Sequence, residues 1–550
     1  MDTGLVFLQL SSLHKVFPDE NYVNLQELSG TAALKGERVS YQILYTSGKT
    51  REYLADISAQ ADPRLKVELR SVGFVPSLLP ARKDEKDEFY LRTAPGLYPD
   101  VLWPMDGEKK KINLWTCHSL YVTVTVPEDM EPGEYPVRVS FALPEETVTK
   151  TFTVRVLDAV LPPQELTYTQ WFHADCIASY YHLPVFSEEH WAMIEKFVAM
   201  AAHTGINLIL TPLFTLPLDT EVGRERPTVQ LVDVRQLADG SYRFGFEKLG
   251  RWIAMCRRCG IHRFEMSHLF SQWGTGCTPK IEAETEEGQK KIFGWHTRGN
   301  SPEYRAFLKA LLPELTAFLK AENAYDDTFF HVSDEPNFQR DYEAYKTQRE
   351  MLEGLIPAEK LMDAISHHEF CDCGLVKRPV SIICAVEDFF AHGYRDIWAY
   401  YCCGPCDRGY TNRLMAMPSG RNRIIGFQLY RYDIHGFLHW GYNFYYSGLS
   451  RRMIDPFRET DADESFQSGD AYSVYPAPEG PIESLRSVVF YEGLQDLRAC
   501  QLLERYIGRD AVIAILEESG PIRFNEFPRT DAGVLAIRER INRKLAEVLA

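Results

Sequence analysis

The sequence lacks the features that mark exported, membrane-spanning and nucleic-acid-binding proteins. Residues Met1–Gly4 include no basic residue, and the apolar run Leu5–Leu10 is too short for a signal peptide or a membrane span. Basic residues form only one run of three, Lys109–Lys111, which we interpret as a solvated turn. Because the formal net charge of −17 would repel a phosphate backbone, we expect no nucleic-acid partner.

The sequence also has no internal repeat, no low-complexity segment and no short disulfide framework. These absences argue against solenoids, disordered tails and small disulfide-stapled folds. The twelve cysteines are spread along the chain, several of them in apolar segments. We therefore expect reduced thiols and a cytoplasmic location.

The residues that are present have the composition of a folded protein, with 45% hydrophobic and 25% charged residues. A chain of 550 residues is too long for one ordinary core, so two or three domains are expected. Aromatic residues reach 13%, which supplies flat faces that can stack on sugar rings, although large cores use the same residues.

Residues 1–160 are predicted to form a β-sandwich. Four segments alternate or run apolar at strand length, namely Val67–Val72, Ser119–Val126, Pro136–Phe141 and Thr149–Val156. Pro132 and Gly133 suit a turn at the corner of two sheets. The consecutive prolines in Leu161–Pro163 end this domain.

Residues 165–450 are predicted to form a (β/α)8 barrel, because short apolar strands alternate with amphipathic helices. The expected strands are Tyr168–His173, Asn207–Thr211, Arg263–His268, Thr328–Ser333, Leu361–Ile365, Ser381–Ala385, Ile397–Tyr401 and Gly436–Trp440. The clearest helices are Glu188–Thr204, Phe246–Cys259, Pro302–Glu322, Gln339–Leu355 and Arg421–Tyr432. A doubly wound sheet is the alternative, but no Gly-rich phosphate loop follows any strand.

The tail is predicted to be a helical segment over residues 481–550. Apolar residues recur at three- and four-residue spacing from Pro481 to Leu503, and a final amphipathic helix fits Ala532–Ala550.

Two adjacent acids, Asp334 and Glu335, follow the strand Thr328–Ser333, and Pro336 ends it. In a barrel the carboxyl ends of the strands open onto the active-site face. Adjacent carboxylates repel each other, which raises the pKa of one and lets it donate a proton near neutral pH. The alternative is that one acid caps the following helix while the other is solvated.

The spacing of the doublet limits the chemistry. Retaining glycosidases need carboxyl groups about 5 Å apart and inverting ones roughly 6.5–9.5 Å, and neighbouring residues rarely flank a glycosidic bond in either way. They suit a third scheme, in which the 2-acetamido group of the substrate attacks the anomeric carbon. One carboxylate then stabilises the acetamido nitrogen as an oxazolinium forms, and the other protonates the leaving oxygen and later activates water.

Several motifs resemble glycoside hydrolase family 123 and the related domain-of-unknown-function family 4091. They are His331–Pro336, Gly436–Asn443, Gly469-Asp470, Tyr475-Pro476, Pro481–Arg486 and Tyr491–Asp496, and the likeness runs from about residue 120 to 505. The resemblance implies cleavage of β-N-acetylgalactosaminides by the substrate-assisted route, with Asp334 stabilising the acetamide and Glu335 as acid/base. Tyr475–Gly480 and Leu494–Leu497 depart from the family pattern, which affects the loop and tail more than the doublet.

Other strand ends supply candidate walls for a sugar pocket, since indoles stack on sugars and Asn or His bonds hydroxyls. The candidates for substrate binding are Trp171, His173, His268, Trp273, Tyr401, Trp440 and Asn443. The same strand ends also carry Asp175, Gln272, Tyr400 and Tyr442. Strand alternation means that only about half of them point inward.

We expect no cofactor, although the cysteines leave a zinc site open. Cys371 and Cys373 follow the fifth strand beside His367 and His368, and Cys402–Cys406 follow the seventh. Soft ligands at two strand ends could meet over zinc, but neither cluster pairs two CxxC units. The alternative is that these cysteines are small residues that line loops and bind no metal.

The sequence thus predicts a glycosidase that acts on terminal β-linked N-acetylhexosamine. One alternative is a two-carboxylate retaining glycosidase with Glu335 as acid/base and a nucleophile near the seventh strand. Residues Ile397–Cys403 contain no acid, however, and the nearest is Asp407, while Glu387 and Asp388 follow the sixth strand. The other alternative is a non-catalytic carbohydrate-binding protein, against which the intact doublet argues.

Overall fold

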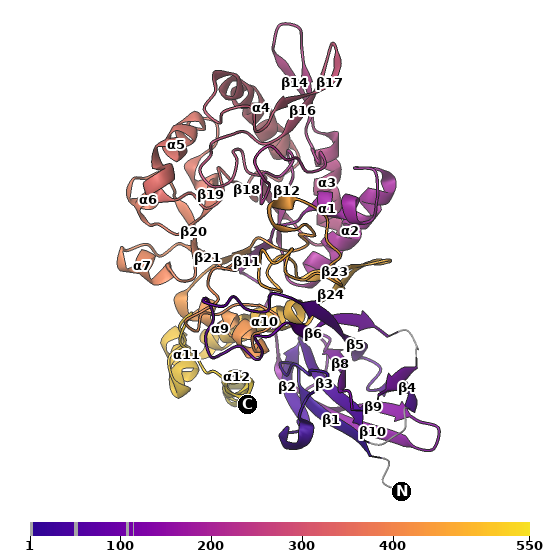
Figure 1. The fold of residues 1–550 in the computed structure, drawn as a ribbon. Coiled ribbons are helices and arrows are strands. Elements are labelled where there is room, and N and C mark those ends of the chain that lie inside the picture. Colours follow the sequence, from indigo (N-terminus) through magenta and orange to yellow (C-terminus); the bar gives the residue numbers. More distant parts are fainter. Residues whose placement is uncertain (1–3, 49–52, 106–108, 114, 550) are drawn as a thin grey trace.

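The computed structural model describes residues 4–48, 53–105, 109–113 and 115–549. The β-rich amino-terminal region consists of two five-stranded sheets, shown in indigo and purple in Figure 1. The first sheet has the order β1 (Leu5–Ser11), β3 (Arg38–Ser47), β8 (His118–Thr125), β5 (Lys66–Ser77) and β6 (Gly96–Pro104). The second has the order β2 (Gly30–Lys35), β10 (Thr147–Val160), β9 (Gly133–Ala142), β4 (Tyr53–Gln60) and β7 (Lys110–Ile112).

These two sheets pack face to face over a shared apolar core. The ring of Tyr41 in β3 stacks on Phe152 in β10 with centroids 3.9 Å apart, and Phe7 meets Phe141 at 4.6 Å. All four strands predicted here are present. The solvated turn predicted at Lys109–Lys111 is wrong, because Lys110–Ile112 pair with β4 as an edge strand.

The following α/β region holds eight short parallel strands, one at each predicted place. One sheet has the order β11 (Thr167–Gln170), β22 (Gly436–His439), β21 (Trp398–Tyr400), β20 (Arg378–Ile382) and β19 (Met362–Ile365). The other has the order β12 (Leu208–Thr211), β15 (Arg263–Met266) and β18 (Thr328–Phe330). A single bridge, Phe330 to Leu361, links the two ladders on one side. On the other side the Asn207 amide donates to the Tyr168 carbonyl at 3.0 Å.

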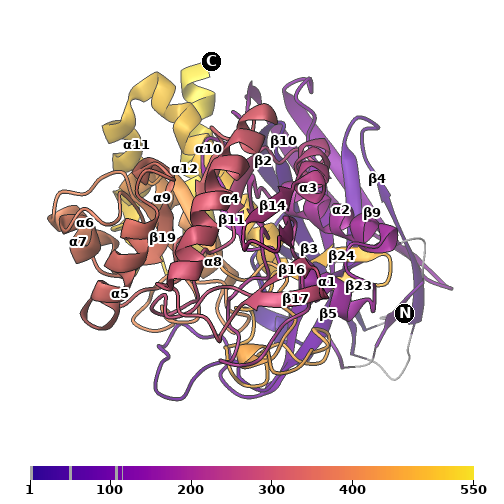
Figure 2. The same ribbon diagram turned by 90° about the horizontal axis from the view of Figure 1, so that it is seen from above.

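Helices follow these strands and cover the outside of the sheets (Figure 2). They are α1 (Ala174–Tyr180), α2 (Glu188–His203), α3 (Glu247–Arg258), α4 (Pro302–Ala321), α5 (Phe338–Met351), α6 (Glu369–Asp372) and α7 (Val386–Ala391). The helix predicted at Arg421–Tyr432 is divided into α8 (Ser419–Arg423) and α9 (Ile425–Tyr432). A mixed sheet, ordered β14 (Tyr242–Gly245), β13 (Asp233–Gln236), β16 (Ile281–Thr285) and β17 (Gly288–Phe293), projects at the top of Figure 1.

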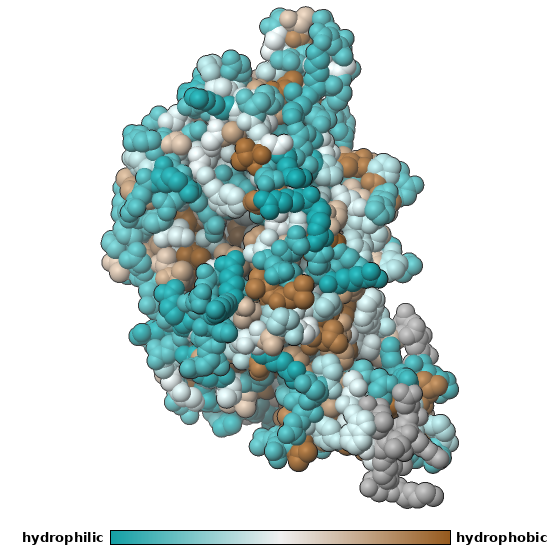
Figure 3. All heavy atoms as spheres, in the orientation of Figure 1, coloured by the Kyte–Doolittle hydropathy of each residue, from teal (hydrophilic) through white to brown (hydrophobic). Residues whose placement is uncertain are grey.

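The carboxyl-terminal segment is helical, as predicted, but its first residues are not. Gly480–Glu483 form β24, which pairs with β23 (Val474–Ala477), and α10 (Leu485–Ile507) begins only after the capping box of Ser484. The helices α11 (Arg509–Leu516) and α12 (Asp531–Leu549) follow. No helix of the described residues is long and apolar enough to cross a membrane. The face shown in Figure 3 is mainly hydrophilic, with small and separate hydrophobic areas.

Helix α10 joins the three regions (Figures 1 and 2). It crosses α9 at Gly426 and Gly493, where a Cβ on Gly426 would lie 1.8 Å from the Gly493 carbonyl oxygen, so only glycine allows this approach. Arg486 of α10 forms a buried two-point ion pair with Asp100 of β6, and Tyr475 donates to the same carboxylate at 2.6 Å. Two of the family-like motifs therefore anchor the β-rich region to the α/β region.

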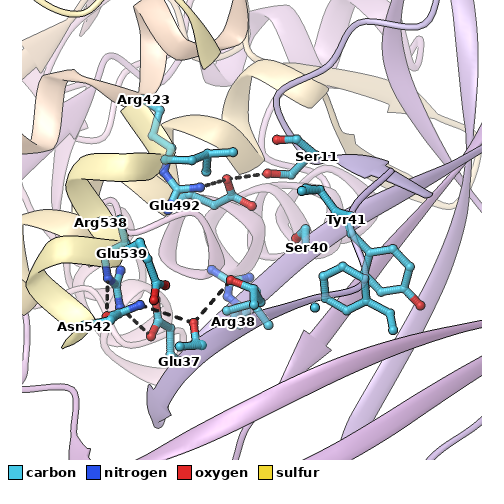
Figure 4. Close-up of a pocket in the computed structure, with 18 of the residues that line it drawn as sticks. Ser11, Glu37, Arg38, Ser40, Tyr41, Arg423, Glu492, Arg538, Glu539 and Asn542 are labelled. Carbon is cyan, nitrogen blue, oxygen red and sulfur yellow. Dashed lines mark hydrogen bonds and ion pairs between the residues drawn. The ribbon is translucent and has the colours of Figure 1, made fainter. Parts of the chain in front are cut away.

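A second set of buried charges lies where α10 and α12 meet the β-rich region, around a cavity of about 240 Å³ (Figure 4). Arg423 binds Glu492 at 2.8 Å and Asp496 at 2.7 Å. Arg538 binds Asp496 at 2.9 Å and Glu37 at 2.7 Å. We call Glu37, Arg423, Glu492, Asp496 and Arg538 the interface cluster. Each carboxylate in it has an arginine partner, which offsets part of the cost of burying its charge.

Candidate active site

A pocket of about 200 Å³ opens at the carboxyl ends of the parallel strands. Its walls come from seven different strand-to-helix connections or strand ends and from the loop that follows β22. The lining residues are Trp171, Leu218, Asp219, Gln272, Trp273, Asp334, Glu335, Ala364, Tyr400, Cys402, Cys403, Leu438, Trp440 and Phe466. This is the face on which a parallel α/β fold places its chemistry.

Asp334 and Glu335 both line this pocket, in the turn between β18 and α5. The cap of α5 is Asn337, whose side chain accepts from the Arg340 amide, so the helix-cap alternative for the doublet is wrong. The Trp273 amide donates to the Asp334 carbonyl at 3.0 Å.

Three residues of the pocket have left-handed backbone conformations that only glycine adopts readily. They are Asp219 (φ 38°), Trp273 (φ 52°) and Glu335 (φ 42°). Such conformations cost on the order of 1–3 kcal/mol each and persist where the surroundings impose them. The surrounding structure therefore holds the backbone at these three positions of the pocket.

Burial raises the pKa of both acids. For Asp334 the negative charge of Glu335 adds to this effect, and the pKa is raised well above its ordinary value. For Glu335 a hydrogen bond from Tyr400, at 2.6 Å, opposes the effect of burial, and the pKa is still raised. Because each negative charge disfavours the other, the state in which the two carboxyl groups share one proton is favoured over the state in which both are ionised.

A buried network beneath the doublet fixes its backbone. Asp363 of β19 accepts from the amides of Val332 at 2.9 Å and Ser333 at 3.2 Å. His331 lies 2.8 Å from Glu265 and 3.5 Å from Asp363. Burial alone would lower the pKa of His331, but these two carboxylates raise it to about 9. The charged imidazole therefore joins β15, β18 and β19 beneath Asp334 and Glu335.

Three of the seven predicted substrate-binding residues line the pocket, namely Trp171, Trp273 and Trp440. The Trp273 side chain is half exposed, at 47%, whereas Trp171 is buried. The Trp440 indole donates to Asp470 at 2.9 Å, which holds this ring in place. These three indoles line the same pocket as the two acids.

The other four predicted residues, His173, His268, Tyr401 and Asn443, are buried and do not line the pocket. Asn443 makes two hydrogen bonds to the backbone of His173, at 2.8 and 3.1 Å. His268 stacks on His331 with centroids 4.4 Å apart. Tyr401 points to the opposite side of β21 from Tyr400, toward Asn422 at 3.5 Å. The structure therefore places these four as supports, and direct substrate contact by any of them stays a prediction.

Asp219, Gln272 and Tyr400 also line the pocket, although they are not among the seven predicted substrate-binding residues. Burial raises the pKa of Asp219 to about 6, although its carboxylate accepts from the Leu449 amide at 2.9 Å. Tyr400 is the neighbour of the predicted Tyr401, and of the two it is Tyr400 that lines the pocket. Asp219 lies eight residues beyond β12 in an irregular loop, where no periodic signal marks it.

The two cysteine clusters do not meet over a metal. Cys402 and Cys403 line the pocket, whereas Cys371 and Cys373 lie on or beside α6. Among the residues that the structure describes, only one group of three side chains has metal-ligand geometry, and it contains no cysteine.

A sequence model described as "Glycoside hydrolase 123, catalytic domain" matches residues 171–503, which is more than half of the chain. The chain belongs to glycoside hydrolase family 123. The predicted resemblance is thereby confirmed, and the protein is a glycosidase of that family. No curated protein matches the sequence.

One solved structure shares the fold of the whole chain. A family 123 glycoside hydrolase from Clostridium perfringens, studied for glycolipid glycan hydrolysis, has a TM-score of 0.74 and 12% identity, covering 99% of this chain and 98% of that one. At this identity the likeness shows the fold. A β-glucuronidase from Bacteroides uniformis (TM-score 0.31, 10% identity, 90% of this chain and 52% of that one) is too distant to carry an argument.

Proposed function

We propose that this glycosidase removes terminal β-linked N-acetylhexosamine, of the galactosamine type, by a substrate-assisted retaining mechanism. The observation that carries the proposal is the placement of adjacent Asp334 and Glu335 in one pocket, with raised pKa values and no ion pair to lysine or arginine among the described residues. The glycolipid glycan named for the structural neighbour is consistent with a glycan substrate.

In this mechanism the acetamido oxygen attacks the anomeric carbon while Glu335 protonates the leaving oxygen. Asp334 accepts the acetamido N–H and stabilises the positive charge of the oxazolinium. Water then opens the ring, and its proton returns to Glu335, so the anomeric configuration is retained. An N–H donated to Asp334 favours its charged form, which leaves the shared proton on Glu335, where the leaving group needs it.

The indoles of Trp171, Trp273 and Trp440 would form the walls for the sugar ring. Tyr400 would position Glu335 by its hydrogen bond. The two parallel sheets would act together as a TIM-like barrel, with β18 and β19 adjacent and β11 beside β12. A cytoplasmic location stays a prediction.

A second candidate mechanism rests on Asp219, which lies in the same pocket. As a carboxylate separate in sequence from Glu335, it could act as the nucleophile of an ordinary two-carboxylate retaining glycosidase. The two mechanisms make opposite predictions for substrates that lack an acetamido group.

A panel of aryl glycosides tests the proposal. We expect hydrolysis of the β-N-acetylgalactosaminide, slower hydrolysis of the β-N-acetylglucosaminide, and none of the plain galactoside or glucoside. A thiazoline mimic of the oxazolinium should inhibit. Turnover of the plain sugars, lost in Asp219→Asn, would instead establish the two-carboxylate mechanism.

A further inference from the structure

A cluster of His368, Asp388 and His392 lies outside the catalytic pocket, where α6 and α7 meet. Each residue offers one ligand atom, and these atoms all lie within 4.8 Å of one another. His368 precedes α6 after β19, whereas Asp388 and His392 lie four residues apart on and just after α7, which follows β20. Figures 1 and 2 both show α6 and α7 side by side at the edge of the molecule.

We propose that His368, Asp388 and His392 form a binding site for a divalent transition-metal ion, of which Zn²⁺ is the best match. Two histidines, one carboxylate and a water molecule are a common tetrahedral set for this ion. Bond lengths of about 2.0–2.1 Å place tetrahedral ligand atoms roughly 3.4 Å apart. The carboxylate of Asp388 lies 3.6 Å from His368 Nε2, which is close to this spacing.

The partner of His368 supports this assignment most directly. Its Nδ1 lies 2.8 Å from the Asp372 carboxylate, which only accepts hydrogen bonds when ionised, so Nδ1 carries the proton and Nε2 keeps a free lone pair. Tyr394 in turn donates to Asp372 at 2.6 Å. A carboxylate that orients a histidine in this way is the usual outer partner of a metal-binding imidazole.

A hydrogen bond also fixes the tautomer of His392, with the proton on Nδ1. Its Nδ1 lies 2.9 Å from the Asp388 carbonyl oxygen, which can only accept, so its Nε2 is free to bind a metal. The two imidazole rings now stack, with centroids 3.6 Å apart and planes 20° from parallel. Metal binding requires these rings to open outward, which the His392 side chain can do because it is 45% exposed.

Bound metal would tie the segment after β19 to the segment after β20, beside the catalytic pocket. Ser366, two residues before His368, interacts with the Tyr400 hydroxyl that holds Glu335. We therefore expect bound metal to steady this rim of the pocket, without taking part in the hydrolysis.

Metal binding is measured on the full chain after removal of metal with a chelator. Zn²⁺ is titrated in competition with a chromophoric chelator, and Co²⁺ binding is followed by its visible absorption, whose intensity reports tetrahedral coordination. Wild type should bind one ion, and His392→Ala and Asp388→Asn should bind at least about 100-fold more weakly. Asp372→Asn, which keeps all three ligands, should weaken binding about 10- to 100-fold.

The matched control is His435→Ala, because His435 faces Asp433 at 3.9 Å on the surface without a third ligand. Added Zn²⁺ should raise the melting temperature of wild type and of His435→Ala, but not of His392→Ala. Zn²⁺ binding that survives unchanged in a His368→Ala/His392→Ala double variant overturns the proposal, and so does wild type without tetrahedral Co²⁺ absorption. Neither readout uses substrate, so a failure here is independent of the proposed hydrolysis.

Discussion

Two groups of buried acids in this molecule differ in how their charge is compensated. In the interface cluster, Glu37, Glu492 and Asp496 each meet Arg423 or Arg538. In the catalytic pocket, neither Asp334 nor Glu335 forms an ion pair within the described residues. Burial raises the pKa of both acids, which favours their protonated forms. Compensation by arginine stabilises an interface, whereas compensation by a proton leaves that proton available for chemistry.

The largest expected effect is on catalysis. Glu335→Gln should lower kcat by about 10²- to 10⁴-fold for substrates with poor leaving groups, because general acid catalysis is lost. Steady-state kinetics on glycosides of increasing leaving-group pKa measure it. Glu492→Gln, its counterpart in the interface cluster, should leave kcat per folded molecule unchanged. Equal losses of kcat in both variants would break the comparison.

Removal of an arginine from the interface cluster should have the largest effect on stability. Arg423→Met leaves Glu492 and Asp496 buried with fewer partners, and we expect a loss of about 3–5 kcal/mol. Denaturant unfolding measures it. The control is Arg258→Met, whose exposed pair with Glu195 should contribute less than about 1 kcal/mol. Similar losses in the two variants would mean that burial of the pair is unimportant.

Loss of the Tyr400 hydroxyl tests whether Glu335 is the group that donates the proton. The hydrogen bond lowers the pKa of Glu335, so Tyr400→Phe should raise this pKa and move the alkaline limb of the kcat/KM profile to higher pH. We expect kcat to fall about tenfold. Tyr401→Phe is the control, since its hydroxyl lies on the other side of β21. An alkaline limb that stays in place would contradict the assignment of Glu335 as the acid.

The smallest expected effect is a gain in stability when the ionisable carboxyl group of Asp334 is removed. Because the pKa of Asp334 is raised on folding, the folded protein holds this proton more tightly. That contribution is complete below the unfolded pKa of about 3.9 and is lost as pH rises through the folded pKa. The free energy of unfolding of Asp334→Asn should therefore exceed that of wild type by about 1 kcal/mol at pH 7. Near pH 4 the two values should be equal. Thermal melts across pH measure the difference, and a less stable variant at pH 7 would contradict it.

Much of the fold could be predicted because its signals are local. Apolar runs of four or five residues located all eight parallel strands, and the spacing of apolar residues located the long helices such as α4. The errors lie where local signals compete. Gly480–Glu483 became a strand because β23 pairs with it, and Lys110–Ile112 became an edge strand against β4. Pairing partners distant in sequence decide such cases.

The candidate site also has parts that local sequence signals predict and parts that they do not. The sequence alone determined the doublet Asp334 and Glu335, because two acids directly after a buried strand are a local pattern, and it determined the family through short motifs. Only the tertiary structure decided which strand-end side chains face the pocket, since a one-residue change of face separates Tyr400 from Tyr401. It also brought in Asp219 and paired His368 with His392, because contacts between separate loops leave no periodic trace in the chain.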